Sequence, residues 1–198
     1  MKNLIFCLLV FCSLACSRKT AEDNSYTPKP KGYPRIDLPK AQYVSLGNGH
    51  PYSFEYSKYA VIKPDTFKNA EPHWIFVYYP DFKANIQLTY KAVNNDKTQL
   101  AKMIADAHKL AAKHNVKASS IEDFVLKTPS GKSVGLIELD GEVPSYLQFY
   151  TTDSTKHFLR GALYFNTATA KDSLAPIIEY VKKDLIQMIN TLKWKDKL

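Results

Sequence analysis

Cysteine is confined to the first sixteen residues of this 198-residue chain, at Cys7, Cys12 and Cys16. Residues 17–198 contain none, so that part can form no disulfide, no thiolate metal site and no cysteine nucleophile. Glycine is also scarce, with 7 residues. The glycine-rich motifs GxGxxG and GxxxxGK[ST] are missing, as is the zinc-protease motif HExxH. The sequence therefore gives no support to dinucleotide, P-loop nucleotide or zinc-protease chemistry.

The charged residues form no nucleic-acid motif. The chain has 27 Lys+Arg and 19 Asp+Glu, a formal charge of +8, but its lysines are spread without an RNP or helix-turn-helix pattern. We therefore expect no nucleic-acid partner. The positive charge either attracts the protein to an anionic membrane or cell-wall polymer, or belongs to a solvated surface. The length and a hydrophobic content of 45% fit one domain with a core.

The apolar run at the N-terminus is too short to span a bilayer. It covers Leu4–Leu14, eleven residues after a basic start, whereas a spanning helix needs about 20. This is the pattern of a secretory signal peptide. The run ends in Ser13-Leu14-Ala15-Cys16, which resembles a bacterial lipobox. We predict a signal peptide over residues 1–15, cleavage before Cys16, and acylation of the Cys16 thiol and new amino group. An ordinary secretory signal is the alternative.

The residues after Cys16 predict where such a lipoprotein is held. Two or more acyl chains anchor a protein stably in a membrane. Ser17 stands where Asp would resemble an inner-membrane retention signal, and Arg18-Lys19 lacks the acidic run that would resemble a surface-export signal. We therefore predict a lipid anchor in the cell envelope, on the periplasmic face of the outer membrane.

A polar and then proline-rich segment precedes the domain. Residues 17–25 are polar and predict a tether. Residues 26–39 contain four prolines, which favour an extended, polyproline-like path. This arm either lies against its own domain as a linker or serves as a docking strap for a partner. We assign residues 16–40 to the lipidated cysteine, tether and arm, and residues 41–198 to a single domain.

Hydrophobic periodicity predicts the elements of that domain. Strands are expected over residues 52–62, 74–79 (central in the sheet, because the run is fully apolar), 85–91, 124–127, 133–140, 145–151 and 157–166. The apolar stripe from Leu100 to His114 predicts a helix with Thr98 as N-cap. A second stripe, Ile177–Leu192, predicts a long C-terminal helix capped by Asp172 or Ser173, with Pro176 in its first turn. Trp194 is expected to close the core.

This order of elements predicts an α+β fold. The expected architecture is an antiparallel sheet with an internal helix and a long C-terminal helix, its last four strands forming a meander. The order resembles the Mog1/PsbP-like α/β/α sandwich, a likeness of fold that supplies no function.

The richest polar stretch is Gln148–Arg160. Ser154, His157 and Asp153 are the residue types of nucleophilic catalysis, since imidazole accepts the hydroxyl proton and a carboxylate orients the imidazole. However, adjacent Asp and Ser are also common turn residues, and no GxSxG motif is present. We favour a polar network that fixes the hairpin. An inward Arg160 would need a carboxylate partner, with Asp153 or Glu138 as candidates.

No cofactor or metal site is predicted. The five histidines have no second histidine or carboxylate at a strong metal-binding spacing, and the carboxylates are scattered. His108, Lys109, Lys113 and His114 are interpreted as a partly solvated helix face.

Two stretches resemble the gliding-motility lipoprotein GldD family of Bacteroidetes. The first is Tyr26-x-Pro28-Lys29-Pro30-Lys31-Gly32-Tyr33-x-Arg35-Ile36-Asp37-Leu38-Pro39. The second comprises Gln148-Phe149, Thr152-Asp153-Ser154 and His157-Phe158-x-Arg160-Gly161-Ala162-Leu163-Tyr164-Phe165. Asp172-Ser173, Pro176 and Trp194 are also in keeping with the family.

The resemblance implies an accessory role and no enzyme activity, catalytic residue or cofactor. The resemblance implies a protein that is required for gliding over surfaces, is linked to type IX secretion, and supports the stability or assembly of GldJ alongside other Gld lipoproteins. No small-molecule substrate is expected. The candidate partner contacts are Tyr26, Pro28, Lys29, Pro30, Gly32, Tyr33, Arg35 and Asp37 on the arm, and Asp153, Ser154, His157 and Arg160 on the hairpin.

Two other functions remain open from the residues alone. One is a periplasmic hydrolase that uses Ser154 and His157. The other is a carrier that holds a small lipophilic ligand between the sheet and a helix.

Overall fold

The computed structural model describes residues 36–166 and 171–195, without the side chains of residues 171–173. All of these residues belong to one contact unit, which begins at Tyr33. The predictions for the signal peptide, Cys16 and arm residues 26–35 lie outside the described residues, whereas Asp37 is described and exposed.

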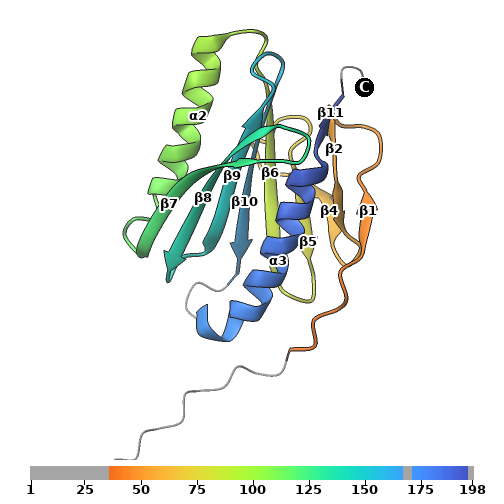
Figure 1. The fold of residues 1–198 in the computed structure, drawn as a ribbon, viewed down its shortest axis with the longest axis vertical. Coiled ribbons are helices and arrows are strands. Elements are labelled where there is room, and N and C mark those ends of the chain that lie inside the picture. The colour runs from red at the N-terminus through yellow and green to blue at the C-terminus, as the bar shows by residue number, and fades with distance from the viewer. Residues whose placement is uncertain (1–35, 167–170, 196–198) are drawn as a thin grey trace, which may run out of the picture. The chain divides into compact units, whose positions relative to one another are not determined.

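A seven-stranded sheet forms the centre of the fold (Figure 1). Its order is β4-β5-β6-β10-β9-β8-β7, and every neighbouring pair is antiparallel. The strands are β4 (Val61–Pro64), β5 (Ile75–Tyr79), β6 (Ala84–Ala92), β7 (Ala118–Lys127), β8 (Ser133–Gly141), β9 (Ser145–Thr152) and β10 (His157–Phe165). The predicted meander of the last four strands is confirmed, and β6 joins it by pairing with β10.

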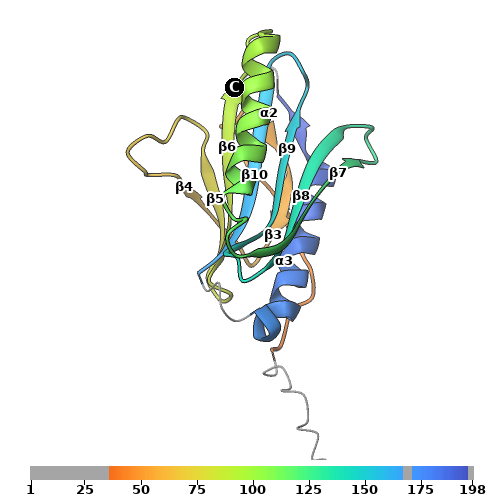
Figure 2. The same cartoon turned by 90° about the vertical axis from the view of Figure 1, so that its left-hand side faces the viewer.

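Helices cover opposite faces of this sheet (Figures 1 and 2). Helix α2 (Lys97–Ala112) packs on one face, against β9 and β10. Helix α3 (Lys171–Thr191) lies on the other face and buries Val181, Leu185 and Ile189 in the main core. The α+β class, the internal helix and the long C-terminal helix are confirmed, in three layers. Neither helix of the described part is long and apolar enough to cross a membrane.

Strand alternation decides which face each side chain meets. On β10, Leu159 and Leu163 belong to the main core beneath α3. Phe158 belongs instead to a small second cluster with Val93 and Met103, beneath α2. The region under α3 is therefore the larger apolar core, and the sheet face under α2 is only partly filled by apolar side chains.

Some predicted boundaries are wrong. The expected strand over 52–62 is divided into β2 (Tyr52–Ser53), β3 (Glu55–Ser57) and β4, because a turn at residues 58–59 is closed by the Ala60 amide donating to the Ser57 carbonyl at 2.9 Å. Strand β3 pairs with β1 (Tyr43–Ser45), and β2 pairs with β11 (Lys193–Trp194). Strand β5 is second from the sheet edge rather than central, and only alternate residues of it are buried.

The helix starts also differ from the predictions. Asp96, not Thr98, caps α2: its carboxylate accepts hydrogen bonds from the amides of Thr98 and Gln99. Asp96 lies directly before the first helical residue, so its carboxylate reaches the free amides of the first turn, whereas Thr98 is already the second residue of the helix. Helix α3 begins at Lys171, so Asp172 and Ser173 lie within it and Pro176 is its sixth residue.

Candidate functional site

The turn between β9 and β10 is built around the Asp153 carboxylate. Its Oδ1 accepts hydrogen bonds from the amides of Thr155, Lys156 and His157 at 3.0, 2.8 and 2.8 Å. Burial alone would raise the pKa of Asp153, but these amides favour the charged form and lower it. Ser154 sits in the exposed turn at φ +68°, and its amide donates to Thr152 Oγ1. Asp153 therefore stabilises the turn, as the polar-network interpretation expects.

His157 is a buried residue of the α3 face. Its Nδ1 lies 2.9 Å from the Tyr90 hydroxyl. Its ring stacks on Trp194 with centroids 5.1 Å apart and planes 10° apart. Its Nε2 is buried and has no hydrogen-bond partner among the described residues. No hydrogen bond of the described chain joins His157 to Ser154, so the structure does not assemble the Ser–His pair of the hydrolase hypothesis.

Arg160 points to the opposite face, because it is three positions after His157 along β10 and successive side chains of a strand alternate between the two faces. Only 8% of Arg160 is exposed. Its Nη2 donates to Gln148 Oε1 at 2.5 Å, and its buried Nε has no hydrogen-bond partner in the described part of the chain.

The predicted carboxylate partners of Arg160 are engaged elsewhere. Asp153 accepts the turn amides, and Glu138 pairs with Lys182 of α3. Among the side chains that the structure describes, in residues 36–166 and 174–195, no carboxylate forms an ion pair with Arg160. Neither candidate carboxylate therefore pairs with Arg160, and the neutral amide of Gln148 accepts its hydrogen bond instead.

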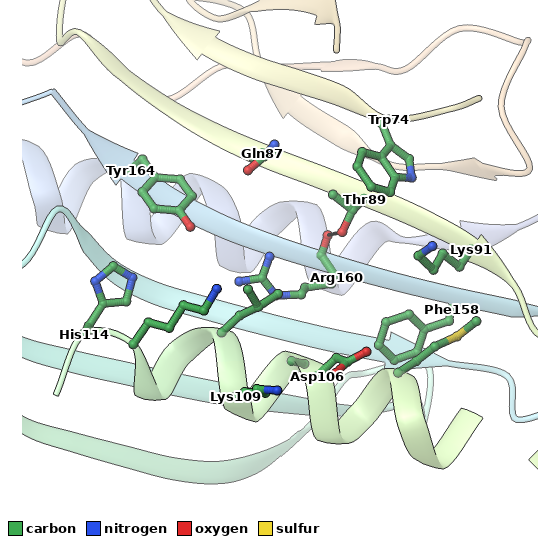
Figure 3. A pocket seen from close by; sticks show the side chains of 14 residues that line it. Trp74, Gln87, Thr89, Lys91, Asp106, Lys109, His114, Phe158, Arg160 and Tyr164 are labelled. Atoms are coloured by element: carbon green, nitrogen blue, oxygen red, sulfur yellow. Dashed lines mark hydrogen bonds between the residues drawn. The ribbon is translucent and has the colours of Figure 1, made fainter. Parts of the chain in front are cut away.

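Arg160 lies in a groove between α2 and the sheet, which we call the basic groove (Figure 3). Its volume is about 660 Å³. One wall comes from α2, and the floor comes from β6, β10 and Trp74 just before β5. The lining residues are Trp74, Gln87, Thr89, Lys91, Met103, Asp106, Ala107, Lys109, Leu110, Lys113, His114, Phe158, Arg160 and Tyr164.

The charge of the basic groove is mostly positive. Lys91 is paired with Glu71 and lies 5.6 Å from the Trp74 ring centre. Lys109 and Lys113 form no ion pair within the described residues, and Asp106 is the one carboxylate in the lining. Burial, and then the charge of Arg160, lower the pKa of His114. His114 is thus neutral at pH 7, and the positive charge belongs to the lysines and Arg160.

The basic groove continues onto an aromatic shelf formed by Phe67, Phe76, Tyr78 and Tyr164. Gln87 and Tyr164 line both hollows. Phe67 is 71% exposed and meets Phe76 edge to face, with ring centres 6.2 Å apart. Large apolar side chains exposed beside a polar groove are typical of binding surfaces.

Comparison with known proteins identifies the family. The chain matches the family described as "Gliding motility lipoprotein GldD" over residues 23–194. The chain belongs to the GldD family. No curated protein matches it in sequence. Among solved structures, it is similar to the solution structure of cyanobacterial PsbP (CyanoP) from Synechocystis sp. PCC 6803, with 13% identity and a TM-score of 0.47, covering 81% of this chain and 97% of that chain.

The β9–β10 hairpin contains residues by which the chain resembles the GldD family, and these residues have different roles. Asp153 and Ser154 shape the turn, and His157 is buried beneath Trp194. Of the four hairpin candidates, Arg160 alone reaches the basic groove. The other arm candidates lie outside the described residues, and Asp37 is exposed on its described end.

The basic groove was missed by the sequence analysis, which interpreted Lys109, Lys113 and His114 as a solvated helix face. The available signal was the spacing of Lys109 and Lys113 at i and i+4, which places both on one face of a helix. Nothing local in the sequence places that face over Arg160. Within the described residues, no group of three or more His, Cys, Asp and Glu side chains could hold a metal ion.

Proposed function

We propose that this GldD-family protein is an accessory lipoprotein of the gliding motility and type IX secretion apparatus that acts by binding other proteins. Acylated Cys16 holds it on the periplasmic face of the outer membrane, and the domain beyond residue 40 contacts partner lipoproteins such as a GldJ-like protein. Binding supports the assembly or stability of those partners. The observation that carries this proposal is the family match, which extends over residues 23–194.

The geometry favours contact over catalysis. The residues proposed for hydrolysis, Ser154 and His157, lie apart in their roles: Ser154 sits in the exposed turn, and His157 is stacked under Trp194 and hydrogen-bonded to Tyr90. The basic groove and aromatic shelf instead present open, partly apolar surface, with Lys109, Lys113 and Arg160 forming no ion pair within the described part of the chain, and such a surface is suited to recognition.

The carrier hypothesis has less support. A groove of about 660 Å³ between helix and sheet is within the usual size range of ligand sites. However, a neutral lipophilic molecule would leave the buried Arg160 charge without a counter-charge, which is costly.

The test is deletion of the gene in a gliding bacterium, with complementation by the wild-type chain. We expect loss of colony spreading and a lower steady-state level of the GldJ-like partner, both restored by the complementing gene. Co-purification of that partner with the membrane-extracted protein would establish contact. Normal spreading and a normal partner level after deletion would refute the proposal.

A further inference from the structure

Arg160 is a buried cation without an anionic partner among the side chains that the structure describes. Its guanidinium donates to the neutral Gln148, its Nε is unpartnered, and the described part of the chain supplies no carboxylate to it. Leaving a buried charge uncompensated destabilises a protein strongly. Such a residue persists most readily where an external anion completes the site.

The side chains around Arg160 also favour an anionic occupant. Lys109 and Lys113 project from successive turns of α2 and line the basic groove without ion-pair partners among the described residues. Asp106 is the one acidic residue in the lining. A molecule whose charge complements the basic groove therefore carries either several acidic groups or a single acidic group that is bound tightly.

The length of the basic groove points to an extended occupant. Its α2 wall is lined from Met103 to Lys113, the C-cap residue of α2, a distance of about 15 Å along a helix axis. About five residues of extended chain cover that length. A free inorganic anion would occupy only the position beside Arg160 and leave the apolar side chains of Met103, Leu110 and Phe158 unused.

The aromatic shelf adds a second requirement. It adjoins the basic groove through Gln87 and Tyr164, and its Phe67 ring is largely exposed. An occupant that follows the basic groove and continues onto the shelf would bury an apolar or aromatic side chain there. Acidic and aromatic groups along one extended chain are the chemistry of a peptide segment.

We propose that the basic groove binds an extended acidic segment of a partner protein, with an Asp or Glu carboxylate on Arg160 and an apolar or aromatic side chain on the shelf. Arg160 is suited to this task because its planar fork matches a carboxylate. This proposal deepens the contact function proposed above and rests on it. The chain's own arm, residues 26–39, is a poor occupant by charge, since its cations Lys29, Lys31 and Arg35 outnumber its one carboxylate, Asp37.

The test is site-specific photo-crosslinking with the full-length lipoprotein in living cells. A benzoylphenylalanine replaces Leu110, which lines the basic groove and is 39% exposed. The matched control carries it at Val116, which is 92% exposed and does not line the groove. The crosslinked peptide is mapped by mass spectrometry. We expect a partner segment at Leu110 that contains Asp or Glu, enriched over the product at Val116.

Charge variants then test the recognition itself. Arg160→Gln should lower the crosslink yield at Leu110 by about tenfold or more, because it removes the buried member of the charge pair. The exposed double variant Lys109→Gln/Lys113→Gln should lower it several-fold without risk to folding. The matched control, Lys97→Gln/Lys102→Gln, makes the same charge change on the same helix outside the groove lining. It should leave the yield unchanged.

Several results would overturn the proposal. These are equal products at Leu110 and Val116, a crosslinked segment without a carboxylate, a crosslink to lipid instead of protein, or equal losses in the two lysine pairs. If deletion abolishes spreading but the groove variants crosslink and spread as wild type does, the basic groove is not the contact and the accessory function stands. If deletion itself has no effect, the proposed function fails, whatever the groove binds.

Discussion

Arg160 of β10 and Gln148 of β9 share a hydrogen bond of 2.5 Å across adjacent strands, on the sheet face that α2 covers. The guanidinium is thereby oriented into the basic groove while its charge remains uncompensated by the described chain. An amide in this place holds the arginine without neutralising it.

Gln148→Glu should therefore weaken binding of an external carboxylate to Arg160. Glutamate has nearly the same shape, and its carboxylate would pair with Arg160 and compete with an external one. We expect the crosslink yield at Leu110 to fall several-fold while the midpoint of urea unfolding stays equal or rises. If the variant is folded and its crosslink yield at Leu110 is unchanged, the partner does not recognise the charge of Arg160.

A buried carboxyl on the other face predicts a pH dependence of stability. Asp184 is 2% exposed and accepts hydrogen bonds from the hydroxyls of Tyr43 and Tyr79 at 3.0 and 3.2 Å. Burial raises the pKa of Asp184 above its usual range, and the tyrosine hydrogen bonds offset this only in part. The folded state consequently holds the proton more tightly than the unfolded state does.

The free energy of unfolding should thus fall as pH rises from about 4 through the raised pKa, by at most about 1.4 kcal/mol per pH unit from this group. Asp184→Asn cannot titrate and should lack that component. The measurement is urea unfolding of both proteins between pH 4 and 8. Parallel pH curves for the two proteins would contradict the assignment.

Gly161 marks a close approach in the core. A Cβ at this position would lie 2.1 Å from Cε1 of the buried Phe149 ring. Gly161→Ala should lower the free energy of unfolding by about 1–3 kcal/mol, because the packed ring cannot move aside. Gly47→Ala is the matched control, since its added Cβ meets nothing within 4 Å, and should change stability by less than about 0.5 kcal/mol. Adding Phe149→Leu to Gly161→Ala should recover part of the loss, and equal effects at the two glycines would exclude this packing.

Cys16→Ala tests the lipid anchor. Without the thiol, neither cleavage before residue 16 nor acylation can occur, so the chain should accumulate as precursor and no acylated mature form should be found in the outer-membrane fraction. Cys12→Ala, within the apolar run, is the matched control and should be processed normally. Processing of both variants to an outer-membrane form would overturn the lipobox assignment.

Local sequence patterns predicted most of the helices and strands, but few of the pairings between strands. The alternation of Ile86 and Leu88 with polar residues predicted β6, and the stripe around Met103 and Ala107 predicted α2. The same patterns could not show that β6 pairs with β10, because a pairing across some seventy residues leaves no local mark. The fully apolar run at β5 suggested a central strand, but β4 alone lies beyond it.

In the candidate site, too, local contacts were predicted from the sequence and long-range contacts were not. Turn residues Asp153 and Ser154 were correctly interpreted as hairpin chemistry, because Asx turns act within a few residues. The sequence raised an inward Arg160 only as a possibility, and the carboxylate partners considered for that case, Asp153 and Glu138, do not pair with it. Whether a carboxylate, an amide or an external group meets it depends on where α2 crosses the sheet, which only the assembled fold determines.

The most direct measurement of the central claim, that this protein works by contact and not by turnover, is colony spreading of the deletion strain complemented at equal membrane levels by Ser154→Gly or by Lys109→Gln/Lys113→Gln. Glycine removes the hydroxyl without strain at φ +68°. The account predicts wild-type spreading with Ser154→Gly and impaired spreading with the lysine pair. Loss of spreading with Ser154→Gly and full spreading with the lysine pair would contradict it.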